Sequence, residues 1–196
     1  MIITFTGAQS SGKSTLLTKM KADSDFDGWV FEPEITRSLK EKYRLSINEE
    51  GDNFTQMVTI NSHVDNYLRN RNSNCVFDRC AIDSLVYTTY LSYKGKVDSE
   101  LGYYAEYVTK KLIEKYDIIF YTDPSIAIVD DGVRSIDVEF RNKIIELFEF
   151  YIEHFQLKNV VKLSGSVEER YKIIKDEIDK VGIEIGRYFT SRSNQR

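Results

Sequence analysis

The sequence predicts an α/β domain in which a parallel sheet is covered by helices on both faces. Short apolar runs, typical of buried strands, alternate along the 196-residue chain with segments whose apolar residues recur at helical spacing. The first of these runs leads directly into a glycine-rich loop, and that loop leads into a helical segment. Such alternation is the pattern of parallel sheets with helices on both sides.

The loop "GAQSSGKST", residues 7–15, has the spacing of a phosphate-binding loop. Gly7, Gly12, Lys13 and Ser14 fit the pattern Gly-x-x-x-x-Gly-Lys-Ser. Glycines let the backbone point several N–H groups at one anion, and the following helix adds the positive end of its dipole. We expect Lys13 to reach the β- and γ-phosphates and Ser14 to ligate Mg²⁺. The expected nucleotide contacts are Gly7, Gln9, Ser10, Ser11, Gly12, Lys13, Ser14 and Thr15.

Five apolar runs are predicted to be the strands of the sheet: residues 2–6, 29–32, 74–78, 117–122 and 159–163. A helix is expected from Thr15 onward, and four further helices are each indicated by a stripe of side chains at helical spacing. The stripes are Phe54, Met57, Asn61, Val64 and Leu68; Leu101, Tyr104, Val108, Leu112 and Tyr116; Ile144, Phe148, Ile152 and Phe155; and Val167, Tyr171, Ile174, Ile178 and Val181. We interpret the aromatic residues at this spacing as mostly core.

Composition restricts the partners of the chain. A formal net charge of −4 argues against a sequence-independent nucleic-acid binder with a large basic face. No apolar stretch approaches the ~20 residues that span a bilayer, and no signal sequence is evident. Cys75 and Cys80 fit neither a disulfide framework nor a zinc site, which indicates reduced thiols. We expect a soluble, cytoplasmic protein with no membrane partner, consisting of one domain over residues 1–186 and a basic tail over 187–196.

Carboxylates and arginines follow three of the predicted strands. They are Glu32, Glu34 and Arg37; Asp78, Arg79 and Asp83; and Asp130, Asp131, Arg134 and Arg141. Because ligands of open parallel sheets bind beyond the carboxyl ends of the strands, we expect these side chains beside the glycine loop. Asp78 is expected to hold Mg²⁺ directly or through water, the alternative being a helix cap.

The residue after Asp78 distinguishes two kinds of chemistry. ATP-driven motor modules usually carry a second acid there to polarise water, whereas this chain has Arg79. An arginine suits a bound phosphate or a hydroxyl acceptor better than an attacking water. The Asn-Lys-x-Asp motif of GTPases is also absent from the sequence. Both observations favour a transferase over a hydrolase.

Five stretches in order, "GAQSSGKST", "PEITR", "FDRCAIDSLVY", "DDGVRSIDVEFR" and "LSGSVEERY", give the chain a family resemblance. Over about residues 2–178 it closely resembles small P-loop ATPases and kinases that include the ribosylnicotinamide kinase domain of bacterial NAD-salvage proteins and many short bacteriophage proteins. More distantly it resembles deoxynucleoside and thymidylate kinases. The resemblance implies a P-loop NTPase fold of nucleoside/nucleotide-kinase type, with five parallel strands in the order 2-3-1-4-5 and a lid at about residues 125–142.

The same resemblance implies roles for individual residues. ATP is the expected phosphoryl donor, Mg²⁺ the cofactor and a nucleoside or nucleotide the acceptor, in a monomer or homodimer. Glu34 or Glu32 is the candidate base near the acceptor hydroxyl, and Arg79 holds the acceptor or the transferring group. Arg134 and Arg141 would be lid arginines, and Gly165 would lie beside the adenine. The expected catalytic residues are Lys13, Glu34, Asp78, Arg79 and Arg134.

Several assignments keep an alternative. Arg134, Asp137 and Arg141 also have the spacing of a surface ion-pair ladder on one helix. Asp83 either orients Arg79 or caps a helix. Gln56 either hydrogen-bonds a nucleobase or, as we favour, is a surface amide.

The two histidines, His63 and His154, have no triad or metal spacing, and we expect them to be structural or exposed.

The stretch "FDRC", residues 77–80, departs from the pattern of the ribosylnicotinamide kinases, which tend to have an acid followed by a small hydroxyl residue. The alternative functions are a kinase acting on DNA, at a strand end or a hydroxymethylated base, and a nucleotide-dependent ATPase or switch.

Overall fold

The computed structural model describes residues 1–124 and 137–193, and its five parallel strands form one sheet in the order β2-β3-β1-β4-β5. The strands are β1 (Ile2–Thr6), β2 (Val30–Glu32), β3 (Cys75–Asp78), β4 (Ile118–Thr122) and β5 (Val160–Leu163). Each begins at, or one residue after, the start of its predicted run and ends with it. The strand order is the one that the resemblance implied, so this part of the prediction is confirmed.

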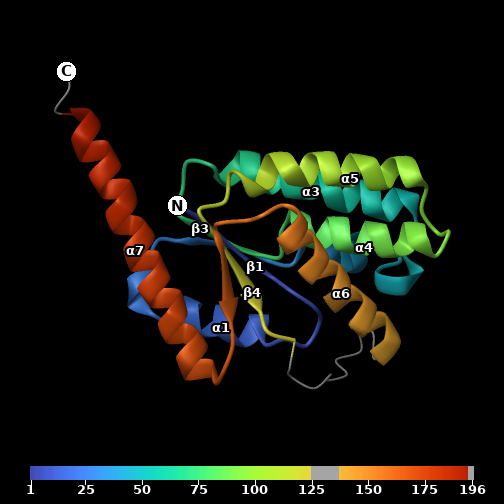
Figure 1. The fold of residues 1–196 in the computed structure, drawn as a ribbon, viewed down its shortest axis with the longest axis horizontal. Coiled ribbons are helices and arrows are strands. Elements are labelled where there is room, and N and C mark those ends of the chain that lie inside the picture. Colours follow the sequence, from blue (N-terminus) through green and yellow to red (C-terminus); the bar gives the residue numbers. More distant parts are fainter. Residues whose placement is uncertain (125–136, 194–196) are drawn as a thin grey trace.

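Helices cover both faces of the sheet (Figure 1). They are α1 (Lys13–Lys21), α2 (Ile35–Tyr43), α3 (Asn53–Asn70), α4 (Ala81–Tyr93), α5 (Ser99–Ile113), α6 (Val138–His154) and α7 (Val167–Ser193). α1 and α7 pack on one face, where Leu16, Met20 and Ile174 meet Phe5 and Phe120 of the strands. The α4, α5 and α6 helices pack on the other face, and α3 lies against α4 and α5.

The two cysteines are buried free thiols in this core. Burial raises the pKa of Cys75 to about 11 and that of Cys80 to about 12. Both thiols therefore stay protonated at neutral pH and act as small apolar side chains, since the thiolate is the reactive form.

The α3 helix forms where its stripe predicted a helix, but most of that stripe does not face the core. Phe54, Met57 and Leu68 of the stripe are exposed, by 57%, 43% and 52%. The buried face is mostly polar and consists of Thr55, Gln56, Thr59, Ile60, His63, Asn66 and Asn70. The reason is that α3 faces other helices and a cleft, so its inner side chains meet polar groups instead of the apolar sheet.

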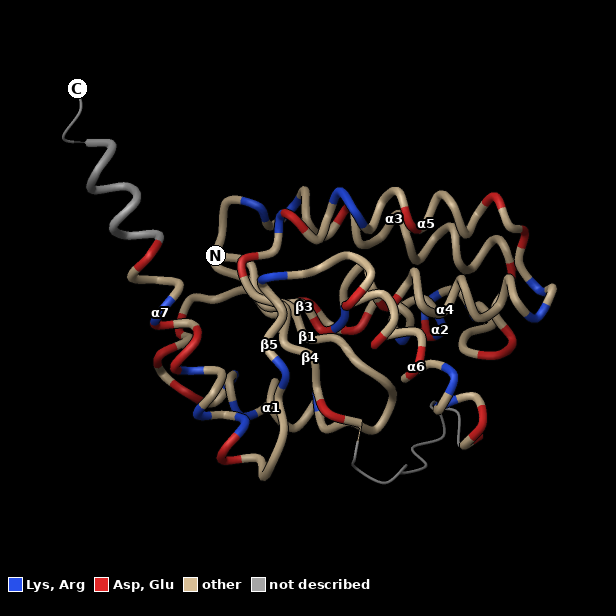
Figure 2. The backbone as a smooth tube through the Cα atoms, viewed as in Figure 1, with Lys and Arg blue, Asp and Glu red and all other residues tan. Residues whose placement is uncertain are grey.

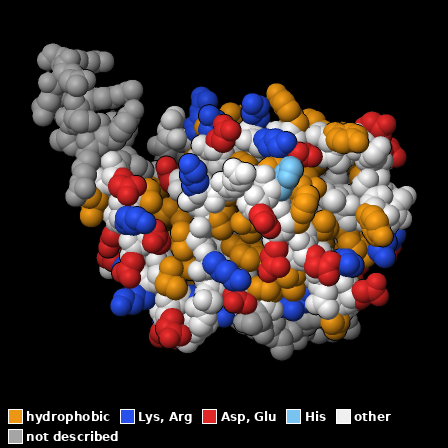
Figure 3. Space-filling model, viewed as in Figure 1, with side chains coloured by type: hydrophobic (Ala, Val, Ile, Leu, Met, Phe, Trp, Pro, Cys, Tyr) orange, Lys and Arg blue, Asp and Glu red, His pale blue; other side chains and the backbone are white. Residues whose placement is uncertain are grey.

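The α7 helix is the longest in the described chain and reaches beyond the body of the domain toward the C-terminus (Figure 1). The predicted tail, residues 187–196, begins within this helix. Within the described residues, none of the helices has the length and apolar content that crossing a bilayer requires. Lys and Arg are interspersed with Asp and Glu along the described chain, and the face shown in Figure 3 carries both signs of charge (Figures 2 and 3).

Candidate active site

The glycine loop between β1 and α1 is held against the end of β4. A Cβ atom on Gly7 would lie 2.7 Å from Thr122 Oγ1, and the φ of Gly7 is +129°. The Ser11 hydroxyl donates to the Ala8 carbonyl at 2.8 Å and lies 2.5 Å from Thr122 Oγ1. Glycine at position 7 is therefore required both by its backbone conformation and by the lack of space for a side chain.

Lys13 is the first residue of α1, and its side chain is buried within the loop. Its Nζ atom donates to the Gly7 and Ala8 carbonyls, each at 2.7 Å. Burial, and then the nearby charge of Arg79, lowers the pKa of Lys13 to about 7. The first turn of α1 carries no acidic side chain, so the positive end of its dipole faces the loop without a competing carboxylate.

Most of the residues predicted to bind nucleotide and metal line one cleft, which we call the loop cleft. Its walls are Gln9, Ser10, Ser11, Gly12, Lys13, Ser14, Thr15, Glu34, Asp78 and Arg79. Burial, and then the charge of Glu34, raises the pKa of Asp78. Ser14 and Asp78 offer hard oxygen ligands, which Mg²⁺ prefers. Within residues 1–124 and 137–193, no group of three or more His, Cys, Asp or Glu side chains could hold a metal ion by itself.

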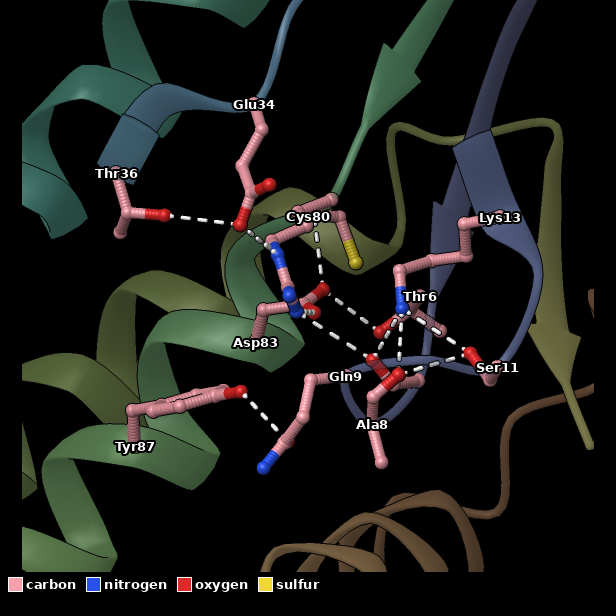
Figure 4. Close-up of polar contacts among 12 residues, drawn as sticks. Thr6, Ala8, Gln9, Ser11, Lys13, Glu34, Thr36, Cys80, Asp83 and Tyr87 are labelled. Atoms are coloured by element: carbon pink, nitrogen blue, oxygen red, sulfur yellow. Dashed lines mark hydrogen bonds and ion pairs between the residues drawn. The ribbon is translucent and has the colours of Figure 1, made fainter. Parts of the chain in front are cut away.

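Arg79 lies between two carboxylates, those of Glu34 and Asp83. Figure 4 shows these two acids together with Lys13 and the glycine loop. The Nε of Arg79 donates to Glu34 Oε1 at 2.5 Å, and its Nη1 donates to Asp83 Oδ1 at 2.8 Å. Its guanidinium also lies 5.8 Å from the centre of the Tyr87 ring. The backbone of Arg79 has a φ of +77°, a conformation that is rare for residues other than glycine. Such strain is typical of functional sites.

Asp83 has both of the roles that the sequence left as alternatives. While one carboxylate oxygen accepts from Arg79, the other accepts from the Cys80 backbone N–H at 3.0 Å and from the Thr6 hydroxyl at 2.7 Å. The second oxygen thereby caps α4 in a capping box. Asp83 fixes Arg79 relative to both α4 and β1.

The two glutamates after β2 have different surroundings. Glu34 contacts Arg79. Burial disfavours the charged carboxylate, but the guanidinium of Arg79 outweighs this effect, and the pKa of Glu34 is lowered to about 2. Glu32 instead accepts from Asn70 at 2.8 Å and from Arg69 at 3.3 Å, at the far end of α3. Of the two candidates for the base, only Glu34 lies in the loop cleft.

A second cleft, which we call the helical cleft, lies between α2, α3 and α4. It is lined by Glu34, Ile35, Thr36, Ile47, Asn48, Thr55, Gln56, Thr59, His63, Arg79, Asp83, Ser84 and Tyr87. Gln56 is 4% exposed, so our interpretation of this residue as a surface amide is wrong. His63 is buried in the same wall, where burial lowers its pKa to about 4. Glu34 and Arg79 line both clefts.

Arg141 reaches the glycine loop from α6. Its Nε donates to the Gln9 carbonyl at 3.3 Å, and its Nη2 donates to the Pro124 carbonyl. Asp137 accepts from the Phe140 backbone N–H at 3.1 Å and so caps α6. Arg134 and most of the predicted lid lie outside the described residues.

Arg170 is a site residue that the sequence analysis missed. It is buried near the start of α7, where Nη1 donates to the Ser11 carbonyl at 3.0 Å and Nε to the Gly165 carbonyl at 2.7 Å. Gly165 has a φ of +93° in the loop between β5 and α7. Arg170 therefore joins this loop to the glycine loop. The signal in the sequence was its place at the end of "LSGSVEER", the stretch that the resemblance puts beside the adenine.

Comparison with known proteins identifies the family of this chain. Residues 2–170 match a family model described as an AAA domain (AAA_28), and the chain belongs to this family. No curated protein matches the chain.

Solved structures of kinases share the fold. A NadR protein in complex with NR has a TM-score of 0.71 at 24% identity, covering 92% of this chain and 51% of that chain. Deoxyadenosine kinase from M. mycoides has a TM-score of 0.64 at 15% identity, covering 92% and 100%. Thymidylate kinase from Ehrlichia chaffeensis has a TM-score of 0.60 at 16% identity, covering 91% and 98%. The chain spans about half the length of the NadR structures that it matches. Its fold is thus a P-loop kinase fold resembling nucleoside and nucleotide kinases.

Proposed function

We propose that this protein is an ATP- and Mg²⁺-dependent phosphotransferase that moves the γ-phosphoryl group of ATP to a nucleoside or nucleotide. The observation that supports this most directly is that two clefts share a wall. The loop cleft has the residues of a phosphate site, the helical cleft has apolar side chains together with a few polar groups, as ligand sites do, and Glu34 and Arg79 line both. A donor and an acceptor bound in these clefts would meet at that pair.

On the donor side, the loop and Lys13 bind the phosphates of ATP, and Gly165 lies beside its adenine. Ser14 and Asp78 would hold Mg²⁺, as the oxygen ligands of both side chains suit this ion. When bound, Mg²⁺ offsets the charge that develops on the phosphate oxygens. Arg141, which donates to the Gln9 carbonyl, supports the loop from the side of α6.

On the acceptor side, Glu34 orients the attacking hydroxyl. With its pKa lowered to about 2 by Arg79, the carboxylate is ionised at neutral pH and accepts a hydrogen bond from the hydroxyl. Little bonding to the attacking oxygen exists in a loose transition state, so a weak base is sufficient. The proton passes to Glu34 as the new bond between oxygen and phosphorus forms.

The experiment that tests this proposal incubates the protein with γ-labelled ATP, Mg²⁺ and a panel of nucleosides, nucleotides, ribosylnicotinamide and DNA. We expect label in a nucleoside or nucleotide. Glu34→Gln should lower turnover by ~10²–10⁴-fold, the usual contribution of a positioned base, with little change in ATP binding. Glu32→Gln is the matched control, because its carboxylate contacts Arg69 and Asn70 instead of Arg79, and it should keep near-normal turnover.

Two results would contradict the proposal. Hydrolysis of ATP that no member of the panel increases would indicate an ATPase or switch. Label in DNA alone would indicate a kinase acting on nucleic acid, and binding should then weaken steeply with salt.

A further inference from the structure

The charged side chains that line the helical cleft in the described part of the chain are already paired with one another. They are Glu34, Asp83 and Arg79, and the guanidinium lies 2.5 Å from one carboxylate and 2.8 Å from the other. Together the three groups carry one net negative charge. The pairs are largely shielded from water, so their fields act at short range with little screening.

This arrangement disfavours an acceptor that carries a phosphate in the cleft. A phosphate monoester has a charge of about −1.5 to −2 at neutral pH and would approach the carboxylates of Glu34 and Asp83. Among the lining residues that the structure describes, Arg79 is the sole cation, and it already donates to both of them. Arg37 lies 3.8 Å from the other oxygen of Glu34, but it lines a neighbouring surface cleft with Ser14 and Asp78 and is absent from the helical one.

The remaining polar lining is neutral and suited to a heterocyclic base. Gln56 lines the cleft and is held in place by accepting from the Thr88 hydroxyl through Oε1 at 3.0 Å. The Ser84 hydroxyl is buried and has no hydrogen-bond partner in the described part of the chain. A buried hydroxyl without a partner is unusual in proteins, and it is explained here if a ligand supplies that partner. Ile35 and Tyr87 provide apolar contact surface.

From these observations we infer that the acceptor is an uncharged nucleoside, whose base contacts α3 and α4 and whose hydroxyl faces Glu34. This inference rests on the proposed function. In the reaction, the nucleoside oxygen bonds to the γ-phosphorus of ATP as the bond from that phosphorus to the β,γ-bridging oxygen breaks. The hydroxyl proton passes to Glu34, and the products are a nucleoside monophosphate and ADP.

The decisive measurement compares nucleosides with their own 5′-monophosphates as acceptors, such as thymidine with dTMP and adenosine with AMP. We expect kcat/KM of the best nucleoside to exceed that of its monophosphate by at least about 100-fold, a difference of about 2.7 kcal/mol. Equal or better use of the monophosphate would overturn the inference and leave the proposed phosphotransferase intact. Absence of transfer to every acceptor would contradict the phosphotransferase itself, and the inference with it.

Ser84→Ala tests the base contact independently. We expect the KM for the nucleoside to rise about 5- to 10-fold, the usual effect of one lost neutral hydrogen bond, with an unchanged KM for ATP. Without ligand the variant should be at least as stable as the wild type, since it removes a buried hydroxyl that no described residue satisfies. The control is Ser62→Ala on α3, whose hydroxyl donates to the Val58 carbonyl and does not line the cleft. A less stable Ser84→Ala protein with normal nucleoside KM would assign the hydroxyl a structural role and overturn this contact.

Discussion

The proposed donor and acceptor sides of the site are built from different parts of the chain. In the loop cleft, residues 9–15 of the glycine loop and the start of α1 supply most of the lining. In the helical cleft, side chains of α3 and α4 such as Gln56 and Ser84 form much of the wall. The comparison teaches that most of the proposed donor side lies in one short stretch of the chain, whereas the proposed acceptor side exists only after distant helices pack together.

Substitution of Lys13 should cause the largest loss of turnover. Lys13→Ala removes the cation that meets the phosphates, so we expect turnover to fall by about 10³-fold with every acceptor, the upper end for loss of one charge-stabilising group. Steady-state kinetics with labelled ATP measures this, and thermal unfolding checks the fold. Lys19→Ala is the control, because Lys19 is on the same helix but pairs with Glu168 at the surface. Unequal losses for different acceptors would contradict the separation of the two sides.

Asp78 should have the next largest effect. Asp78→Asn keeps the size of the side chain but removes its negative charge, so we expect turnover to fall roughly 10- to 100-fold and to need more Mg²⁺. A titration of the rate against Mg²⁺ measures both changes. Asp65→Asn, an exposed acid on α3, is the control. An unchanged Mg²⁺ dependence would remove Asp78 from the metal site.

Arg170 tests whether the donor side extends to the loop at Gly165. Arg170→Gln loses the charge-assisted hydrogen bonds to the carbonyls of Ser11 and Gly165, so we expect the KM for ATP to rise about tenfold, or ~1.4 kcal/mol, with a smaller change in kcat. Arg170→Lys should recover part of the affinity because it keeps the charge. An equal loss of kcat and of thermal stability in both variants would indicate a purely structural residue.

The smallest expected effect is on the pH dependence of stability, through His63 in the wall of the helical cleft. Burial lowers the pKa of His63 to about 4, with Asp83 and Arg79 contributing in opposite directions. As the pH falls below the ordinary value near 6.5, the unfolded chain binds a proton that the folded chain does not bind until about pH 4. Stability therefore decreases as the pH falls through this range.

Between pH 7 and pH 5.5 we expect the wild type to lose about 1 kcal/mol more stability than His63→Gln, as measured by urea unfolding. His154→Gln, which changes the exposed histidine on α6 outside both clefts, is the control for loss of an imidazole. Parallel pH profiles for the wild type and His63→Gln would show that His63 titrates as it does in the unfolded chain.

The sequence predicted the loop cleft better than the helical cleft, because the loop cleft depends mainly on local patterns in the chain. The strands and the glycine loop follow from local apolar runs and from the spacing of Gly7, Gly12 and Lys13, whereas the strand order follows from the family resemblance. The face of α3 could not be predicted, because a stripe of apolar residues indicates the core only when the helix packs on an apolar partner. The role of Arg170 depends on contacts with Ser11, 159 positions away in the sequence, and no local pattern records such a contact.

The polar inner face of α3 has a consequence for how this protein can change over evolution. Thr55, Gln56, Thr59 and His63 line the helical cleft from a single helix, and none of them lines the loop cleft. Substitutions at these four positions alter the shape and hydrogen-bonding pattern offered to a base without moving the main chain around Lys13. Under the proposed function, new acceptors can thus be acquired one side chain at a time while phosphoryl transfer is retained, and a library randomised on α3 alone is the natural starting point for redesigning specificity.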